Sequence, residues 1–132
     1  MQCTKNTLGK EERLKSRKRI EILFDTGEKI HHYPFKVLLK TTDDTDFSYP
    51  AKIAVSVSKR NFKRAVDRNH IKRKMREAYR LNKHALYNSL TKSDQKLFFF
   101  VVYIAKDDKP YNIIEKEMKV LIHKIENKLE LT

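Results

Sequence analysis

Residues 56–80 read SVSKRNFKRAVDRNHIKRKMREAYR, a run in which lysine and arginine far outnumber the acidic residues. An α-helix turns by about 100° per residue, so Ile71, Met75 and Ala78 gather on one side, roughly 120° from the basic side chains. That basic sector holds Arg68, Lys72, Arg73, Arg76 and Arg80. One side therefore suits a protein core, and the other suits a strongly anionic partner, because solvation alone explains a surface of one charge sign poorly.

The whole chain is basic as well. It has 132 residues, 30 Lys and Arg against 17 Asp and Glu, and a formal net charge of +13. This length predicts a single domain over residues 1–132, with residues 1–12 as a flexible N-terminal tail. A polyanionic partner would relieve the self-repulsion of so much positive charge, and nucleic acid leads an acidic membrane surface as that partner.

Composition excludes several classes of protein. Gly9 and Gly27 are the only glycines, so no glycine-rich loop can cradle a nucleotide phosphate. The single cysteine, Cys3, can form neither an internal disulfide nor a zinc finger. No apolar run reaches the roughly 18 residues of a membrane span, and the first residues lack the apolar core of a signal peptide. We expect a cytoplasmic protein without a membrane partner.

Helical signals appear at three places. Ser16 is a plausible N-cap and Gly27 a plausible C-terminal cap for the first helix. Asn112 and Glu115 resemble a capping box before an apolar stripe that runs to the C-terminus. The predicted helices cover residues 17–25, residues 64–86 and the C-terminal segment from about residue 112.

Strand signals separate these helices. The predicted strands cover residues 30–40, 51–58 and 97–105, and Pro34 is expected at an edge or at a strand start because it cannot donate to a ladder. The run LFFFVVYIA at 97–105 is expected to be a central strand covered on both faces, with Phe98, Phe99 and Phe100 in the core. The elements predict an α+β sandwich with one mixed sheet of three to four strands and three helices, in the order α-β-β-α-β-α.

Residues 68–77, RNHIKRKMRE, resemble the signature helix of the bacterial ribonuclease P protein subunit, whose pattern runs Arg-Asn-x-x-Lys-Arg-x-x-Arg-Glu. Residues 54–60, AVSVSKR, resemble the strand and loop that precede that helix. Arg13-Leu14-Lys15, and Phe24 followed by Gly27, resemble the first helix of the family. The likeness extends over about residues 13–128 in the right order, and it needs no large insertion.

This resemblance implies a ribonucleoprotein function. The protein would act as the cofactor of an endonuclease, without catalytic residues of its own. It would bind the catalytic RNA and precursor tRNA, whose 5′ leader the complex removes, and it would need no obligatory protein partner. Magnesium would be held mainly by the RNA, with none bound by the protein alone. The family also implies a left-handed crossover from strand 51–58 through helix 64–86 to strand 97–105.

Two sets of site residues follow from the resemblance and from side-chain chemistry. Arginine and lysine suit phosphate oxygens, asparagine suits a base edge or a 2′-hydroxyl, and phenylalanine can stack on unpaired bases. The set for the catalytic RNA is Lys59, Arg60, Arg64, Arg68, Asn69, Lys72, Arg73 and Arg76. The set for a leader-binding cleft between the first helix and the sheet is Arg13, Lys15, Phe24, Phe35, Lys36, Ser56 and Ser58.

The chain departs from the family pattern at three positions. His70 stands where the motif often has a third arginine. Ile20 and Leu38 stand where the family often has aromatic residues, so the predicted cleft has less surface for stacking.

Three other functions are weighed against the cofactor hypothesis. A ribosomal or single-strand RNA-binding protein could share the sandwich, but it would not need the 68–77 motif. A stand-alone nuclease would need acidic or histidine residues at ligand or acid–base spacing, and no such cluster can be identified. A DNA-binding helix–turn–helix would need a second helix just before residue 64, where the sequence predicts a strand.

Overall fold

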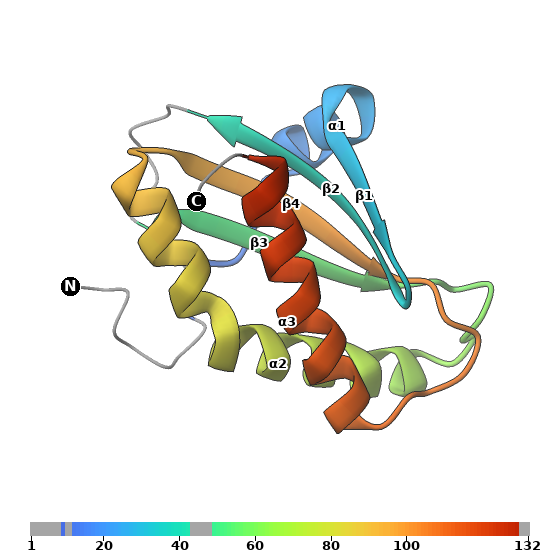
Figure 1. Cartoon of the computed structure of the whole chain (residues 1–132). Helices are drawn as coiled ribbons and strands as arrows, with labels where there is room; N and C mark the ends of the chain where they lie inside the picture. Colours follow the sequence, from blue (N-terminus) through green and yellow to red (C-terminus); the bar gives the residue numbers. More distant parts are fainter. Residues whose placement is uncertain (1–8, 10–11, 43–48, 130–132) are drawn as a thin grey trace.

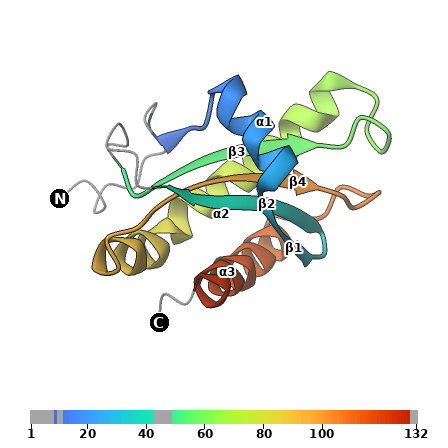
Figure 2. The same cartoon turned by 90° about the horizontal axis from the view of Figure 1, so that it is seen from above.

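The computed structural model describes residue 9, residues 12–42 and residues 49–129 (Figure 1). These residues form three helices and one mixed four-stranded sheet. Figure 2 shows α1 (Arg17–Thr26) on one side of the sheet and α3 (Tyr111–Lys128) on the other. The predicted α+β sandwich is confirmed. None of the helices in the described part of the chain is long and apolar enough to cross a membrane.

The strand order across the sheet is β1-β2-β4-β3. The central strand β4 (Lys96–Tyr103) pairs antiparallel with β2 (Phe35–Thr42) and parallel with β3 (Ala51–Val57). Parallel neighbours need a crossover connection, which α2 (Ala65–Lys92) supplies. The prediction of a central strand near residues 97–105 is therefore confirmed.

The segment predicted as one strand over residues 30–40 is a hairpin. Its first strand is β1 (Glu28–His32), which pairs antiparallel with β2 in a register that places Ile30 opposite Val37. The chain reverses at Tyr33 and Pro34, and proline suits this position because it has no N–H to give to a ladder. The hairpin provides the fourth strand of the sheet.

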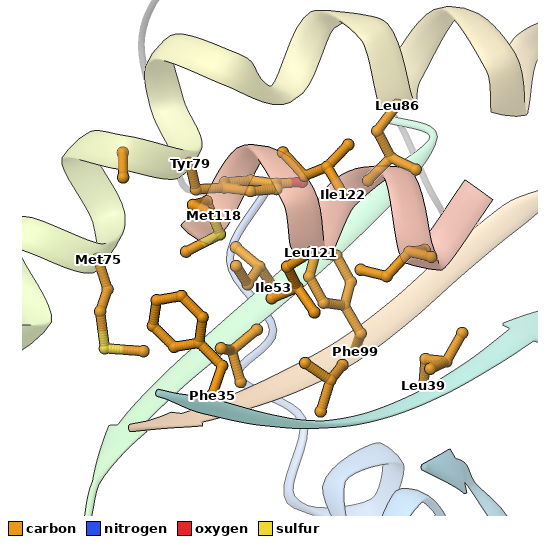
Figure 3. Close-up of a cluster of buried hydrophobic side chains, with 14 of the residues drawn as sticks. Phe35, Leu39, Ile53, Met75, Tyr79, Leu86, Phe99, Met118, Leu121 and Ile122 are labelled. Atoms are coloured by element: carbon orange, nitrogen blue, oxygen red, sulfur yellow. The ribbon is translucent and has the colours of Figure 1, made fainter. Parts of the chain in front are cut away.

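The two faces of the sheet carry two separate cores. Odd-numbered side chains of β2, β3 and β4 point toward α2 and α3 and form the larger core, part of which Figure 3 shows. Its members include Phe35, Leu39, Ile53, Phe99, Met75, Tyr79, Met118 and Leu121. Even-numbered side chains point toward α1, where Leu38 and Phe98 pack with Leu14 and Leu23.

The helix ends test the capping predictions. The hydroxyl of Ser16 accepts a hydrogen bond from the Arg19 N–H at 3.3 Å, as predicted for the N-cap of α1. Gly27 follows α1, and a Cβ there would lie 2.5 Å from the carbonyl oxygen of Leu23, so no larger residue fits without a shift. The capping box predicted at Asn112 is wrong, because α3 begins after Pro110 with no side-chain cap.

Candidate nucleic-acid interface

The helix α2 has the two sides that its sequence predicts. Ile71, Met75 and Ala78 are fully buried against the sheet and α3. On the other side, Arg64, Asn69 and Arg73 are exposed, and Lys72 and Arg76 are half-buried. The apolar contacts fix the rotation of the helix, so they also determine which cations face solvent.

Arg68 has a structural task within this helix. Its guanidinium Nη1 donates to the carbonyl oxygens of Phe62 and Lys63, each at 2.9 Å, and so ties the preceding loop to the first turn of α2. The Asn61 side chain donates to the carbonyl of Ile104 at 3.2 Å, which fastens the same loop to the end of β4. The exposed side chains of Lys59 and Arg60 therefore stand on a loop that is anchored on two sides.

Three other basic residues of α2 have partners within the protein. Lys74 donates to a carboxylate oxygen of Asp108 at 2.5 Å and to the carbonyl of Lys109 at 2.7 Å. His70 Nε2 lies 3.5 Å from the other carboxylate oxygen of Asp108. Arg80 pairs with Glu77 through two hydrogen bonds of 3.0 and 2.6 Å. Asp108 in the loop after β4 and Glu77 at the end of the motif therefore neutralise part of the positive charge of α2.

A second candidate surface lies on the α1 side of the sheet, and we call it the α1 face. Phe24, which is 59% exposed, packs edge-on against Phe100 with ring centroids 5.6 Å apart. On the strands beside these rings, Lys36 and Ser56 both pair with Val102 of β4. The residues of the α1 face are Phe24, Lys36, Ser56, Phe100 and Val102.

The structure moves one predicted cleft residue out of this surface. Phe35 has no exposed area, and it points from β2 into the core beside Met75 (Figure 3). Its ring packs against Tyr103 at 6.2 Å on the face covered by α2 and α3. Phe35 is therefore a core residue, and the prediction that it stacks on the leader is wrong for this geometry.

Phe100 is the residue that the sequence interpretation missed. The apolar run predicts Phe100 in the core with Phe98 and Phe99, but Phe100 is half-buried and belongs to the even-numbered face. Leu38 is its cross-strand partner on β2, so a ring stands on the strand next to the position where the family often has an aromatic side chain. Alternation along β2 puts Lys36 and Phe35 on opposite faces, but only the strand register shows that Phe100 of β4 lies on the face of Lys36.

The segment before α1 packs along β3. The Leu14 N–H donates to the Ile53 carbonyl at 2.8 Å, and Arg13 and Ile53 form an isolated parallel bridge. Of the tail predicted over residues 1–12, the structure describes Gly9 and Glu12, and Glu12 is buried rather than free in solvent. Arg13 and Lys15 therefore lie beside β3, close to the basic side of α2.

Fold, charge and exposed surfaces together define a class: small basic α+β proteins with a cationic helix beside a partly open sheet face. The family model for ribonuclease P matches residues 8–126. This chain therefore belongs to the ribonuclease P protein family.

Individual relatives agree with the family match. The ribonuclease P protein component of Porphyromonas gingivalis strain W83 is 35% identical over 114 residues, which cover 85% of this chain and 81% of the relative. That of Chlorobium phaeobacteroides is 33% identical over 129 residues, covering 91% and 88%. The structure of the Staphylococcus aureus RNase P protein has a TM-score of 0.62 at 22% identity and covers 86% of this chain and 94% of that one, a likeness of fold.

Proposed function

We propose that this chain is the protein cofactor of ribonuclease P: it binds the catalytic RNA and the 5′ leader of precursor tRNA and supports endonucleolytic maturation of the tRNA 5′ end. The observation that carries the proposal is the two-sided α2. Its apolar side is locked in the core, while the same turns present Asn69, Lys72 and Arg73 to a partner. Cations held in fixed places suit a folded polyanion, because each neutralised phosphate releases counterions.

The α1 face is the proposed site for the single-stranded leader. Phe24 and Phe100 offer ring surface on which unpaired bases can stack, and Lys36 offers a cation for the backbone between them. The hydroxyl of Ser56 can donate or accept a hydrogen bond on the neighbouring strand. Stacking and charge tolerate any base, which suits a leader whose sequence varies from one tRNA precursor to another.

Magnesium is assigned, as part of this proposal, to the RNA. Within the described residues, no three histidine, cysteine or acidic side chains come together. Mg²⁺ needs a shell of oxygen ligands, and the described residues offer no cluster of carboxylates that would supply one by protein alone. The protein would therefore contribute binding and orientation, and no catalytic step is assigned to its side chains.

Reconstitution tests the proposal directly. The full chain would be combined with bacterial ribonuclease P RNA at low magnesium, and removal of the 5′ leader from a labelled precursor tRNA would be followed. We expect efficient cleavage when both components are present and none with the protein alone. If the protein bound the RNA but left cleavage unchanged, it would be an RNA-binding protein of another kind.

A further inference from the structure

An aromatic ring is exposed at the turn of the β1–β2 hairpin. Tyr33 is 59% exposed, the same fraction as Phe24. Within the described part of the chain, these two are the aromatic residues that have most of their surface in solvent. The proposed leader site uses Phe24 and leaves Tyr33 without a task. A single exposed apolar residue needs no explanation by itself, so the case for Tyr33 depends on what surrounds its ring.

The backbone that carries Tyr33 is fixed by two neighbouring loops. The Ile104 N–H, just after β4, donates to the carbonyl of Pro34 at 2.8 Å. The loop after β3 joins them, because the Asn61 side chain donates to the Ile104 carbonyl. Figure 1 shows the hairpin turn and the loops after β3 and β4 at the same end of the sheet. We call this region the loop end, and it consists of residues 33–34, 58–64 and 104–110.

Lys109 holds one side of the Tyr33 ring. Its ammonium lies 5.2 Å from the ring centroid, which is a cation–π contact. Lys109 is itself fixed, since its N–H donates to the Tyr103 hydroxyl at 3.1 Å and its carbonyl accepts from Lys74 at 2.7 Å. Its ammonium also lies 3.4 Å from a carboxylate oxygen of Asp107. The ring is therefore held in place, while most of the residue remains open to solvent.

The loop end is strongly basic. Its two longer loops contain six lysine and arginine residues against two acidic ones, and these two, Asp107 and Asp108, pair with Lys109 and Lys74. Proteins bind unpaired nucleic acid by combining aromatic rings with positive charge. A nucleotide brings both a flat ring and a negative phosphate, so the loop end suits a nucleotide. Its exposed cations are Lys59, Arg60, Lys63, Arg64 and Lys106.

The loop end lies between the two surfaces of the proposed function. Lys36 of the α1 face follows Tyr33 by three residues at the start of β2 and pairs with Val102. On the other side, Arg64 ends the loop after β3 and begins α2. An RNA strand that extends from Lys36 toward the start of α2 therefore runs along the loop end.

We propose that Tyr33 is a stacking platform for one unpaired base, and that Lys109 is the residue that positions its ring. The assignment of this base to ribonuclease P RNA or to precursor tRNA rests on the proposed function. Both sources offer the same chemistry, a flat base next to a negative phosphate, so an experiment must separate them. Stacking on Tyr33 does not select a particular base, because every base has a π-face.

The first test uses fluorescence. The chain contains no tryptophan, so Tyr33→Trp gives a signal from this position alone, which a stacked base should quench. Emission would be recorded with ribonuclease P RNA, and then with the reconstituted complex on adding mature tRNA or leader-bearing precursor tRNA. Quenching by ribonuclease P RNA alone assigns the base to that RNA, and quenching that appears only with the precursor assigns it to the leader. The matched control, Val120→Trp at an exposed position of α3, should not respond. No quenching of Tyr33→Trp by any of these RNAs would overturn the platform.

The second test separates the ring from the hydroxyl and Lys109 from charge in general. Tyr33→Leu should weaken binding of the responding RNA roughly 5- to 150-fold, the range for a lost base stack, whereas Tyr33→Phe should bind like wild type. Lys109→Gln should weaken binding in the wild-type chain but add little to Tyr33→Leu, because its role is to hold the ring. Lys106→Gln removes the same charge from an exposed position of the same loop and should have an equal effect in both backgrounds. Equal losses for Tyr33→Leu and Tyr33→Phe would overturn stacking, and a Lys109→Gln loss that is additive with Tyr33→Leu would remove the positioning role.

Failure of the proposed function would look different. A single-stranded oligoribonucleotide of mixed sequence should also quench Tyr33→Trp, at a higher concentration, because stacking does not require tRNA. If wild-type protein failed to support leader removal while this response persisted, the proposed function would be wrong and the platform retained. If leader removal were normal and Tyr33→Leu bound every RNA like wild type, the function would be retained and the platform removed. A polyglutamate peptide of equal charge should give no response, and quenching as strong as that by the oligonucleotide would show that charge alone acts there.

Discussion

The ring of Phe100 is in contact on one side and open on the other. Phe24 packs against it edge-on, and its neighbours across the strands are Leu38 and Ala54. These two partners are smaller than an aromatic residue, so Phe100 remains only half-buried on the α1 face. A base that stacked there would cover apolar surface that the fold leaves unpaired.

We expect Phe100→Leu to weaken binding of leader-bearing precursor tRNA by the reconstituted complex. Leucine keeps the position apolar but removes the ring, and a lost base stack corresponds to a roughly 5- to 150-fold fall in affinity. Binding of mature tRNA, which lacks the leader, should change little. Equilibrium binding of both RNAs measures the difference. Leu81→Ala is the control, since Leu81 is an exposed apolar residue of α2. Equal losses for both RNAs would refute the leader role of Phe100.

The sequence predicted Phe35 in the cleft and Phe100 in the core, whereas the structure buries Phe35 and leaves Phe100 partly exposed. This difference has a physical cause. Alternation along a strand separates side chains into two faces, and it correctly placed Phe35 with Val37 and Leu39. It does not tell which face a helix covers completely. The short α1 covers only part of the even-numbered face, whereas α2 and α3 bury the odd-numbered face. That difference depends on tertiary packing between distant segments, so local pattern could not supply it.

At the scale of elements, α2 divides its cations between protein and solvent. Neighbouring positions differ sharply: Arg73 is exposed, whereas Lys74 is bound to Asp108 and to the backbone of the loop before α3. The two carry the same charge on the same turn. They therefore form a matched pair for asking which charges of the signature helix reach RNA.

We expect Arg73→Gln to lower the salt-dependence slope of binding to ribonuclease P RNA by about 0.7 to 0.9, as for one lost phosphate contact. Lys74→Gln should leave the slope nearly unchanged, because its ammonium is already neutralised by Asp108. It should instead loosen the loop before α3, which hydrogen exchange can report. Filter-binding titrations at several salt concentrations measure the slopes. If Lys74→Gln lowered the salt-dependence slope as much as Arg73→Gln, Lys74 would also contact RNA, and the proposed difference between the two side chains would be wrong.

Element boundaries show how far local signals extend. The N-cap at Ser16 and the start of α2 near residue 64 were predicted well, because capping and periodicity depend on a few neighbours. The end of α2 lies at Lys92 rather than near residue 86, since Tyr87 and Leu90 continue its buried stripe. Pro34 was correctly expected at an edge or a strand start, since β2 begins at Phe35, but the sequence interpretation of residues 30–40 as one strand missed the turn and the separate strand β1.

At the scale of the whole molecule, the buried pair of Glu12 and Lys83 ties the start of the described chain to the middle of α2. Burial by itself would raise the pKa of Glu12. Hydrogen bonds from Lys83, Tyr87 and the Gly9 N–H outweigh it, so the pKa lies below its ordinary value. A carboxyl with a lowered pKa stabilises the folded state above its unfolded pKa, and the contribution is lost as pH falls through the folded pKa. Residues 71 positions apart in sequence share this contact, and no local pattern reveals it.

We therefore expect Glu12→Gln to lower the free energy of unfolding at pH 7 by about 3 to 5 kcal/mol, because Lys83 would keep a buried charge without its counter-ion. The double variant Glu12→Gln with Lys83→Met should recover much of this loss, since no charge is then left buried alone. The difference in free energy of unfolding between wild type and Glu12→Gln should become smaller below about pH 4.3, where Glu12 of the unfolded chain takes up a proton. Urea denaturation across this pH range measures both effects. A gap that is the same at pH 3 and pH 7, or a double variant no more stable than the single one, would show that the pair does not anchor the N-terminal segment.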